Sequence, residues 1–314
     1  MKYPTFPRVV AALFLCKVLA CSLAAEWKES ETSIGWLSEE GEVIWEFVWD
    51  AAAGKPYFHP LRVPGGPELT KLRPEDHAWH YGMWFSWKLI NEVNYWEENG
   101  GKAEGATRWS DPKIEKTEDG GVVIRLRIDY VHPSGRIDLK EYRDLVISKV
   151  ERNGKYTIDW TSHFTAGSEG AYLDRTPLPN EPGGKLWGGY GGLSVRLAHG
   201  EDPVSFVTEG GPLEDFVDNR SRPRTPAVGV TVFPKERNSG SLAMLSDPRN
   251  MIGDQSWYLI NGQPSRFACA AVLVPGPKQL DAGEVWELSY RLVVRPKAWD
   301  AEDLETEMIR WLRR

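Results

Sequence analysis

Short runs of β-branched and aromatic residues, separated by turn-forming residues, dominate the chain from residue 42 to residue 294. In "EVIWEFVWD", Val43, Trp45 and Phe47 alternate with the residues between them, which is the period of an extended strand. About ten such runs follow one another without amphipathic helical patterns between them, a succession typical of antiparallel sheets that pack face to face. We therefore predict an all-β fold, a large antiparallel β-sandwich.

Turn-forming residues indicate how neighbouring strands connect. "EDGG" (residues 118–121) and "RNGK" (residues 152–155) each lie between two strand-like runs, as the turns of β-hairpins do. The stretch 167–192 contains too many glycines and prolines for a strand, so we expect a long loop there. Long loops in compact domains often carry functional residues.

A short C-terminal helix completes the predicted fold. Asp300 is a suitable N-cap, and arginines follow at the far end, where they complement the helix dipole. We expect the helix to pack on a sheet through its apolar residues Leu304, Met308, Ile309 and Leu312.

The first 25 residues have the order of a secretory signal peptide. Basic residues precede an apolar run, and small residues follow it. The run is shorter than the ~20 residues of a transmembrane helix, and Lys17 interrupts it. We therefore predict a signal peptide over residues 1–25, one β-sandwich domain over residues 26–314 with no transmembrane span, and export to the periplasm or the cell exterior. Lipid attachment at Cys21 is an alternative.

Charge and cysteine content argue against a nucleic-acid-binding protein and against a fold stabilised by disulfides. The 45 acidic residues outnumber the 38 basic ones, for a net charge of -7, which argues against nucleic acid as a partner. Removal of the signal peptide leaves Cys269 alone, so no intramolecular disulfide can form. The sequence does not define the oligomeric state.

Titratable and aromatic residues are concentrated in the segment 57–87. His59 and Arg62 precede a loop rich in glycine and proline, and His77 and His80 follow it. Because a loop between two strands brings its ends together, His59 could approach the other two histidines. The segment therefore predicts a functional site with groups that titrate near neutral pH.

Three roles for this cluster remain open. A neutral histidine can act as acid or base, with Asp76 or Glu75 fixing its tautomer. Alternatively, His59, His77 and His80 could bind a divalent metal ion together with a carboxylate. The histidines and Arg62 could also simply hydrogen-bond a bound sugar or carboxylate.

Aromatic residues in irregular segments are candidates for contact with a ligand. Trp79 and Trp187 lie among polar or glycine-rich neighbours, and a flat indole ring suits the apolar face of a sugar. Tyr190 lies between glycine pairs that allow a close approach to a ligand. The adjacent pair Glu97 and Glu98 is interpreted as part of a solvated turn.

The motifs "HPLRVPGG…DHAWHYGMWFSW", "NYWEE", "YGGLSVR" and "LDAGEVWELSYRLVV" together resemble an exported bacterial family labelled methane oxygenase PmoA-like. That label implies several transmembrane spans, which the mature chain lacks. The resemblance implies instead a β-sandwich of the galactose-mutarotase type, a supersandwich found among exported sugar-degrading proteins. Asp247 stands where the family pattern has a histidine. The family's recurrent motif positions are occupied by His59, His77, Trp79, His80, Tyr190 and Arg196.

These observations lead to one main hypothesis and two alternatives. We expect an exported carbohydrate-active enzyme, a lyase, hydrolase or epimerase, that acts on a saccharide by histidine acid/base chemistry. The alternatives are a glycan-binding module without turnover and a metal-dependent enzyme. The predicted catalytic residues are His80, His77 and Tyr190. The predicted substrate-binding residues are His59, Arg62, Trp79, Trp187 and Arg196.

Overall fold

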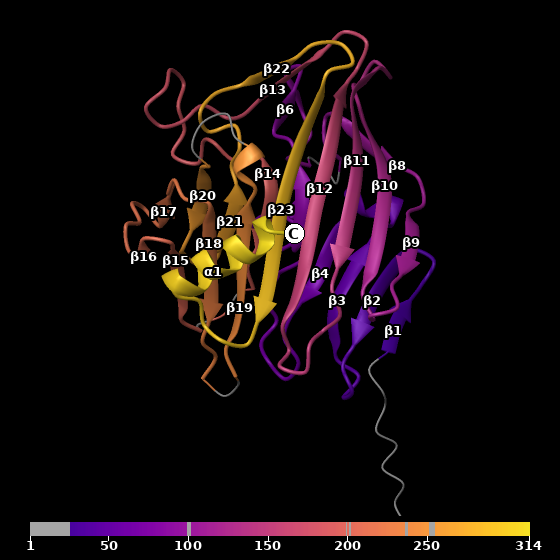
Figure 1. Ribbon diagram of the computed structural model, residues 1–314. Coiled ribbons are helices and arrows are strands. Elements are labelled where there is room, and N and C mark those ends of the chain that lie inside the picture. The colour runs from indigo at the N-terminus through magenta and orange to yellow at the C-terminus, as the bar shows by residue number, and fades with distance from the viewer. Residues whose placement is uncertain (1–25, 99–101, 199, 201, 236–237, 251–254) are drawn as a thin grey trace, which may run out of the picture.

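The computed structural model describes residues 26–314 except 99–101, 199, 201, 236–237 and 251–254 (Figure 1). The predicted signal peptide, 1–25, and the alternative lipid site at Cys21 lie outside the described residues. Over the part that is described, the chain forms 23 strands, two 3-10 helices and one α-helix. The 3-10 helices are η1 (Ala51–Ala53) and η2 (Pro248–Asn250). No helix in this part is long and apolar enough to cross a membrane.

A nine-stranded antiparallel sheet forms one layer of the fold. Its strands, in spatial order, are β1 (Glu26–Glu29), β2 (Ser33–Leu37), β3 (Val43–Val48), β4 (Tyr57–Leu61), β5 (Met83–Ser86), β14 (Gly192–Arg196), β21 (Phe267–Ala270), β20 (Trp257–Ile260) and β17 (Arg220–Ser221).

A ten-stranded sheet forms the second layer. Its strands, in spatial order, are β16 (Gly211–Pro212), β15 (Val204–Thr208), β18 (Ala227–Val232), β19 (Gly240–Ser246), β23 (Val285–Arg295), β12 (Tyr156–Ala166), β11 (Ile137–Ile147), β10 (Val122–Val131) and β8 (Ala106–Trp109), with β9 (Lys113–Lys116) also paired to β10. Both predicted turns connect hairpins of this layer, because β9 pairs antiparallel with β10 and β11 with β12.

A small four-stranded sheet lies at one end of the two layers, at the top of Figure 1. It consists of β22 (Lys278–Leu280), β13 (Ala171–Asp174), β6 (Leu89–Ile90) and β7 (Val93–Asn94). The presence of β13 corrects the expectation that the stretch 167–192 has no strand. Backbone hydrogen bonding to β6 and β22 stabilises an extended conformation in spite of the glycines nearby.

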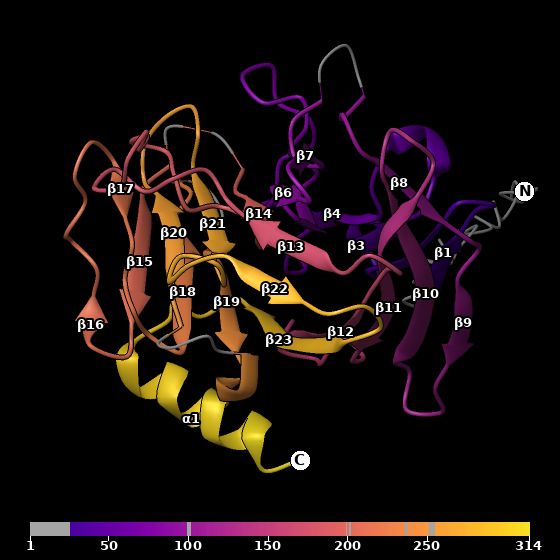
Figure 2. The ribbon, with the colours of Figure 1, turned by 90° about the horizontal axis from the view of Figure 1, so that it is seen from above.

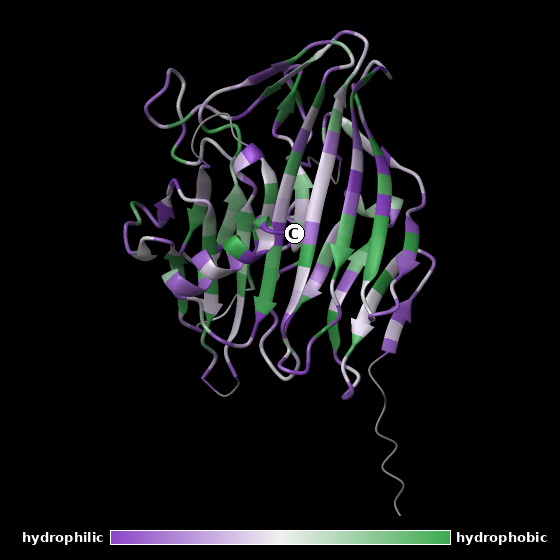
Figure 3. Ribbon diagram, viewed as in Figure 1, coloured by the Kyte–Doolittle hydropathy of each residue, from purple (hydrophilic) through white to green (hydrophobic). Residues whose placement is uncertain are grey.

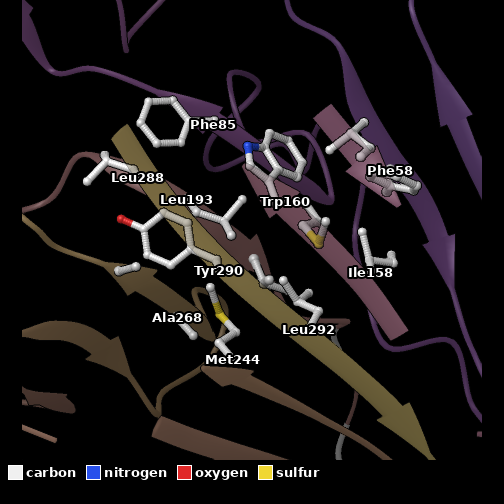
Figure 4. Packing of buried hydrophobic residues seen from close by; sticks show 14 of the residues in the cluster. Phe58, Phe85, Ile158, Trp160, Leu193, Met244, Ala268, Leu288, Tyr290 and Leu292 are labelled. Carbon is white, nitrogen blue, oxygen red and sulfur yellow. The ribbon is translucent and has the colours of Figure 1, made fainter. Parts of the chain in front are cut away.

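The main core lies between the two large sheets. Strands β10, β11 and β12 of the ten-stranded sheet alternate between apolar and polar residues, as the bands along them show (Figure 3). Phe58, Phe85 and Leu193 of the nine-stranded sheet pack in the same cluster as Trp160 and Leu292 of the ten-stranded sheet (Figure 4). The structure thus confirms the predicted all-β fold with large antiparallel sheets and a short C-terminal helix.

The helix α1 (Ala301–Leu312) covers the outer face of the ten-stranded sheet over β15 and β18 (Figure 2). The Asp300 carboxylate accepts a hydrogen bond from Asp303 N at 2.8 Å, as predicted for the N-cap. Leu304 and Met308 are buried against the sheet. The predicted apolar face was too wide, because Ile309 and Leu312 are exposed.

Candidate functional site

A second aromatic cluster covers the face of the nine-stranded sheet that is turned away from the ten-stranded sheet. The side-chain alternation of strands produces it. Along β5, Met83 and Phe85 belong to the core between the sheets, whereas Trp84 belongs to the outer cluster. Tyr258 of β20 and Phe267 of β21 lie in the same outer cluster. This outer aromatic face is the floor of the candidate site.

A cavity of about 290 Å³ opens on this face. Its volume lies near the low end of the ~300–1,000 Å³ that ligand pockets usually have, so it suits a ligand of one or two rings. Most of its wall is aromatic, and a few polar side chains complete it. The lining residues are His77, Trp79, His80, Trp96, Glu97, Trp187, Tyr190, Arg220, Tyr258, Ile260, Ser265 and Phe267.

A tight double turn places both predicted histidines on one side of the cavity. His77 N donates to Pro74 O at 3.0 Å, and His80 N donates to His77 O at 3.0 Å. The backbone is therefore turned rather than extended between the two histidines. Their rings stack with centroids 4.7 Å apart and an interplanar angle of 30°.

Asp76 fixes the orientation of His77. Its carboxylate accepts hydrogen bonds from His77 Nδ1 at 2.7 Å, from Arg196 Nη2 at 2.7 Å and from Ser265 Oγ at 2.6 Å. Burial acts to raise the pKa of Asp76, but these hydrogen bonds outweigh it and hold the pKa far below its usual range. Because the ionised carboxylate can only accept, Nδ1 of His77 carries the proton, and its Nε2 presents a lone pair when the ring is neutral.

His80 is a buried, neutral member of the same cluster. Its ring lies between those of His77 and Phe267, the latter at a centroid distance of 5.2 Å. Burial, reinforced by the neighbouring positive charge of Arg196, holds the pKa of His80 well below its ordinary value. Arg196 Nη1 lies 3.3 Å from Nδ1, which must accept from the guanidinium. His80 is therefore neutral at pH 7.

Glu97 and Tyr190 form a second polar pair in the cavity wall. The Tyr190 hydroxyl and Lys88 Nζ both donate to the Glu97 carboxylate, and Asn94 Nδ2 donates to it at 2.7 Å. Burial acts to raise the pKa of Glu97, yet the charge of Lys88 and these hydrogen bonds hold it below the usual value. Burial raises the pKa of Tyr190, and the charge of Glu97 raises it further. At neutral pH the pair is thus a carboxylate and a protonated phenol.

The interpretation of Glu97 and Glu98 as a solvated turn was wrong. Glu98 is buried and accepts from Lys55 Nζ at 2.5 Å and from the Tyr81 hydroxyl at 2.7 Å. Lys55 also donates to Trp96 O at 3.3 Å, and burial lowers its pKa. This buried network anchors the backbone beneath Trp96 and Glu97, so both residues are held in the cavity wall.

Trp79 and Trp187, the two tryptophans predicted to contact a ligand, both line the cavity. The ring of Trp79 meets that of His77 edge-on, with centroids 5.3 Å apart. Trp187 is 50% exposed, and Arg222 holds its loop by donating to Leu186 O and Gly188 O, each at 2.8 Å. The structure thereby gathers Trp79, Trp187, His77, His80 and Tyr190 around one cavity.

His59 and Arg62 do not join this cavity. His59 Nδ1 lies 2.9 Å from Thr70 Oγ1, and Arg62 Nη2 donates to Glu68 Oε2 at 2.9 Å. The structure therefore does not bring His59 to His77 and His80, as the sequence had suggested. Among the described residues, no group of three or more His, Cys, Asp and Glu side chains is arranged to hold a metal ion. The two ends of the segment do meet, because β4 pairs antiparallel with β5, but His59 lies beside Thr70 and does not line the cavity.

Several lining residues were missed by the sequence analysis. Most of them come from strands and turns far along the chain, which the strand order of the sheet brings to the histidines, whereas Trp96 and Glu97 follow β7 soon after the histidine segment. Alternating aromatic residues in the later strands were the one available signal. The missed residues are Trp96, Glu97, Arg220, Tyr258, Ile260, Ser265 and Phe267.

Asp247 lies elsewhere in the fold. It follows β19 of the ten-stranded sheet and forms an ion pair with Arg249 at 2.7 Å, in a hollow that also includes Asp159 and Trp311. The aspartate that departs from the expected family pattern is therefore not a residue of the aromatic cavity.

The fold and the cavity define an all-β protein with an aromatic pocket on the open face of one sheet. The chain belongs to the family of unknown function DUF6807, whose model matches residues 37–308. The description of this family does not support the methane oxygenase label that the motifs had suggested. No curated protein matches the sequence.

Several solved structures match the chain at low similarity. An α-galactosidase from Lactobacillus brevis matches 87% of this chain with a TM-score of 0.47 and 9% identity. The galactosidase domain of an α-galactosidase-sucrose kinase matches 87% with a TM-score of 0.43 and 9% identity. This chain spans 40% of the length of each. A galactose mutarotase related enzyme from Lactobacillus acidophilus matches 88% of this chain and 99% of its own, with a TM-score of 0.35 and 9% identity.

Proposed function

We propose that the aromatic cavity binds a saccharide and that His77, oriented by Asp76, transfers a proton to or from it. The observation that carries this proposal is the combination of aromatic walls with convergent polar groups in one cavity. Flat rings such as Trp79 and Trp187 suit the C–H faces of a sugar, and the polar groups suit its hydroxyls.

The chemistry follows from the protonation states. Asp76 holds the proton of His77 on Nδ1, so Nε2 is the nitrogen that can accept a proton from a substrate and return it. The Glu97 carboxylate, paired with the Tyr190 hydroxyl, is a second proton-transfer group in the same wall. Acid and base are thus available together, which suits epimerisation or elimination as well as hydrolysis.

The sequence-based prediction named both His80 and His77 as catalytic residues; this proposal keeps His77 as the acid or base and gives His80 another role. His80 is 5% exposed and enclosed between two rings, whereas the His77 side chain is 37% exposed. A group that exchanges protons with a substrate must reach it, so His77 is the better acid or base. We assign His80 the role of a positioning residue that supports the His77 ring.

Binding without turnover is the second candidate. It is favoured by the contacts of Glu97, whose carboxylate already receives hydrogen bonds from Lys88, Asn94 and Tyr190. A carboxylate with three such partners is well suited to holding a hydroxyl and less suited to accepting a proton.

A saccharide screen separates the two candidates. The purified protein is incubated with a panel of mono-, oligo- and polysaccharides while reducing ends, absorbance of new double bonds and anomeric exchange are followed. Binding is measured in parallel through tryptophan fluorescence, which reports on the cavity directly. Turnover that is lost in His77→Ala supports the enzyme. Binding without turnover supports the binding module. If the protein shows neither turnover nor binding, both candidates are rejected.

We also propose that the protein is exported, because residues 1–25 have the pattern of a signal peptide. Fractionation of the producing cell and sequencing of the mature N-terminus test this. A mature chain that begins near residue 26 in the periplasm or medium supports export. An intact N-terminus in the cytoplasm contradicts it.

A further inference from the structure

Arg220 is held at the edge of the cavity by a tight turn. Val217 and Arg220 exchange two backbone hydrogen bonds of 2.9 Å, and the residues between them, Asp218 and Asn219, have φ angles of 48° and 63°. Asp and Asn tolerate this left-handed conformation better than most residues. Asn261 N donates to Asn219 O at 2.9 Å, which docks the turn on the neighbouring β20–β21 connection. The backbone hydrogen bonds of this turn therefore fix the position of Arg220 at the edge of the sheet.

The guanidinium of Arg220 has only neutral partners. Its Nε donates to the Tyr258 hydroxyl at 3.1 Å, and its Nη1 donates to Asp218 O at 2.7 Å. Within the described ranges, no carboxylate forms an ion pair with Arg220. These contacts use two of the five N–H donors of the guanidinium, so three donors remain for a ligand.

The other charges of the site are balanced. Lys88 pairs with Glu97, and Arg196 pairs with Asp76. His80 is neutral because burial lowers its pKa. Arg220 is therefore the one lining cation without a carboxylate partner among the residues that the structure describes, and it leaves the cavity with an excess of positive charge.

A second arginine increases this excess. The Arg222 guanidinium lies 4.8 Å from the Tyr258 ring centroid, and its described hydrogen-bond partners are the carbonyls of Leu186 and Gly188. Two guanidinium groups thus flank Tyr258 without a described carboxylate between them. Beside an aromatic wall that lowers the local dielectric, such charge favours an anionic ligand group.

We propose that Arg220 binds the carboxylate of a uronic acid, so that the saccharide taken by this cavity is an acidic one. This inference rests on the proposed saccharide-binding function. The planar guanidinium fork matches a carboxylate in geometry and charge. A sulfate ester on a sugar offers the same charge and similar acceptors, so the experiment includes it as a separate arm.

The test compares matched ligands on the purified protein. Galacturonate, galactose and galactose 6-sulfate are titrated separately against wild type, Arg220→Gln and the control Arg127→Gln, with tryptophan fluorescence as the readout. Arg127 lies on β10 of the other sheet. We expect wild type to bind galacturonate at least about tenfold more tightly than galactose, because charge-assisted hydrogen bonds are about twice as strong as neutral ones.

The variants and salt then assign the preference to Arg220. In Arg220→Gln the preference for galacturonate falls about tenfold or more, whereas Arg127→Gln keeps it. The wild-type preference also weakens as salt is added, a readout that does not depend on how the variant folds. If wild type instead prefers galactose 6-sulfate, has no preference for galacturonate, and loses the first preference in Arg220→Gln, then Arg220 binds an anionic group but the ligand is not a uronic acid.

Two further results separate this inference from the proposed function. If galactose and galacturonate bind equally and salt has no effect, the proposal of an acidic saccharide is rejected, whereas the proposal of saccharide binding is retained. Failure of all three sugars to bind, together with a negative saccharide panel, overturns both.

Discussion

The rings of His77 and His80 stack with centroids 4.7 Å apart, and the two residues differ in exposure. His77 faces the cavity and is tied to Asp76, whereas His80 is buried against Phe267. A separation of three residues in a turn, rather than in a strand, creates this pair. The structure thereby places the partly exposed ring of His77 against the buried ring of His80.

Replacement of His77 by alanine is expected to reduce turnover by about a hundredfold or more, because general acid–base catalysis contributes ~10²–10⁴-fold. His132→Gln serves as the control, since His132 hydrogen-bonds Ser134 in the β10–β11 turn, outside the cavity lining. Initial rates on the best substrate from the screen measure the effect. An unchanged rate in His77→Ala would remove this residue from the mechanism.

The free energy of unfolding is expected to decrease as the pH is lowered, in part because of His80. Its folded pKa lies well below that of the unfolded chain, about 6.5, because burial disfavours the charged ring. The unfolded state therefore binds more protons as the pH drops through 6.5, and the contribution of His80 is present above that value and is lost below it. The slope is up to about 1.4 kcal/mol per pH unit for one such group.

Urea unfolding of wild type and His80→Gln between about pH 5 and pH 8 tests this linkage. The variant should show a shallower dependence on pH, even if its stability at pH 8 is lower. It will retain some slope, because burial also lowers the pKa of His59. Identical slopes for the two proteins would contradict a neutral, buried His80.

The Tyr190 hydroxyl is expected to set the acidic limb of the activity profile. It donates to Glu97 and so helps to hold the pKa of that carboxyl low. Tyr190→Phe removes this hydrogen bond, which raises the pKa of Glu97 and moves the acidic limb of kcat/KM to higher pH. The control is Tyr142→Phe, an exposed tyrosine of β11. Superimposable profiles for wild type and Tyr190→Phe would exclude Glu97 from the ionisations that control activity.

Trp187 is expected to contribute to affinity and not to stability. Because half of its side-chain surface is exposed, Trp187→Ala should change the unfolding free energy by less than about 1 kcal/mol. The loss of a stacking surface should weaken saccharide binding by about tenfold. Trp84→Ala is the matched contrast, since Trp84 is fully buried and its removal should cost about 3–5 kcal/mol. A reversed pattern would place Trp187 among the structural tryptophans.

Local sequence signals predicted the parts of the fold that depend on neighbouring residues. The two hairpin turns and the Asp300 cap were found in this way, because turn and cap preferences act over a few residues. Trp79 and Trp187, selected for their irregular surroundings, line the cavity, and their contact with a ligand stays a prediction.

The sequence did not predict contacts between residues that are brought together only by the order of the strands in the sheet. His59 precedes β5 by a loop and was expected beside His77, but it packs on Thr70 instead. Tyr258 and Phe267 reach the cavity only because β20 and β21 follow β14 in the sheet. Glu97 looked like a surface residue because its partners Lys88 and Tyr190 are not recognisable as neighbours before the fold is known.

A crystal structure with the most tightly bound saccharide tests the central claim most directly. The account predicts a sugar ring against Trp79 or Trp187, with one of its hydroxyls within hydrogen-bond distance of His77 Nε2. A saccharide bound elsewhere, for example in the hollow beside Asp247 and Trp311, would contradict it.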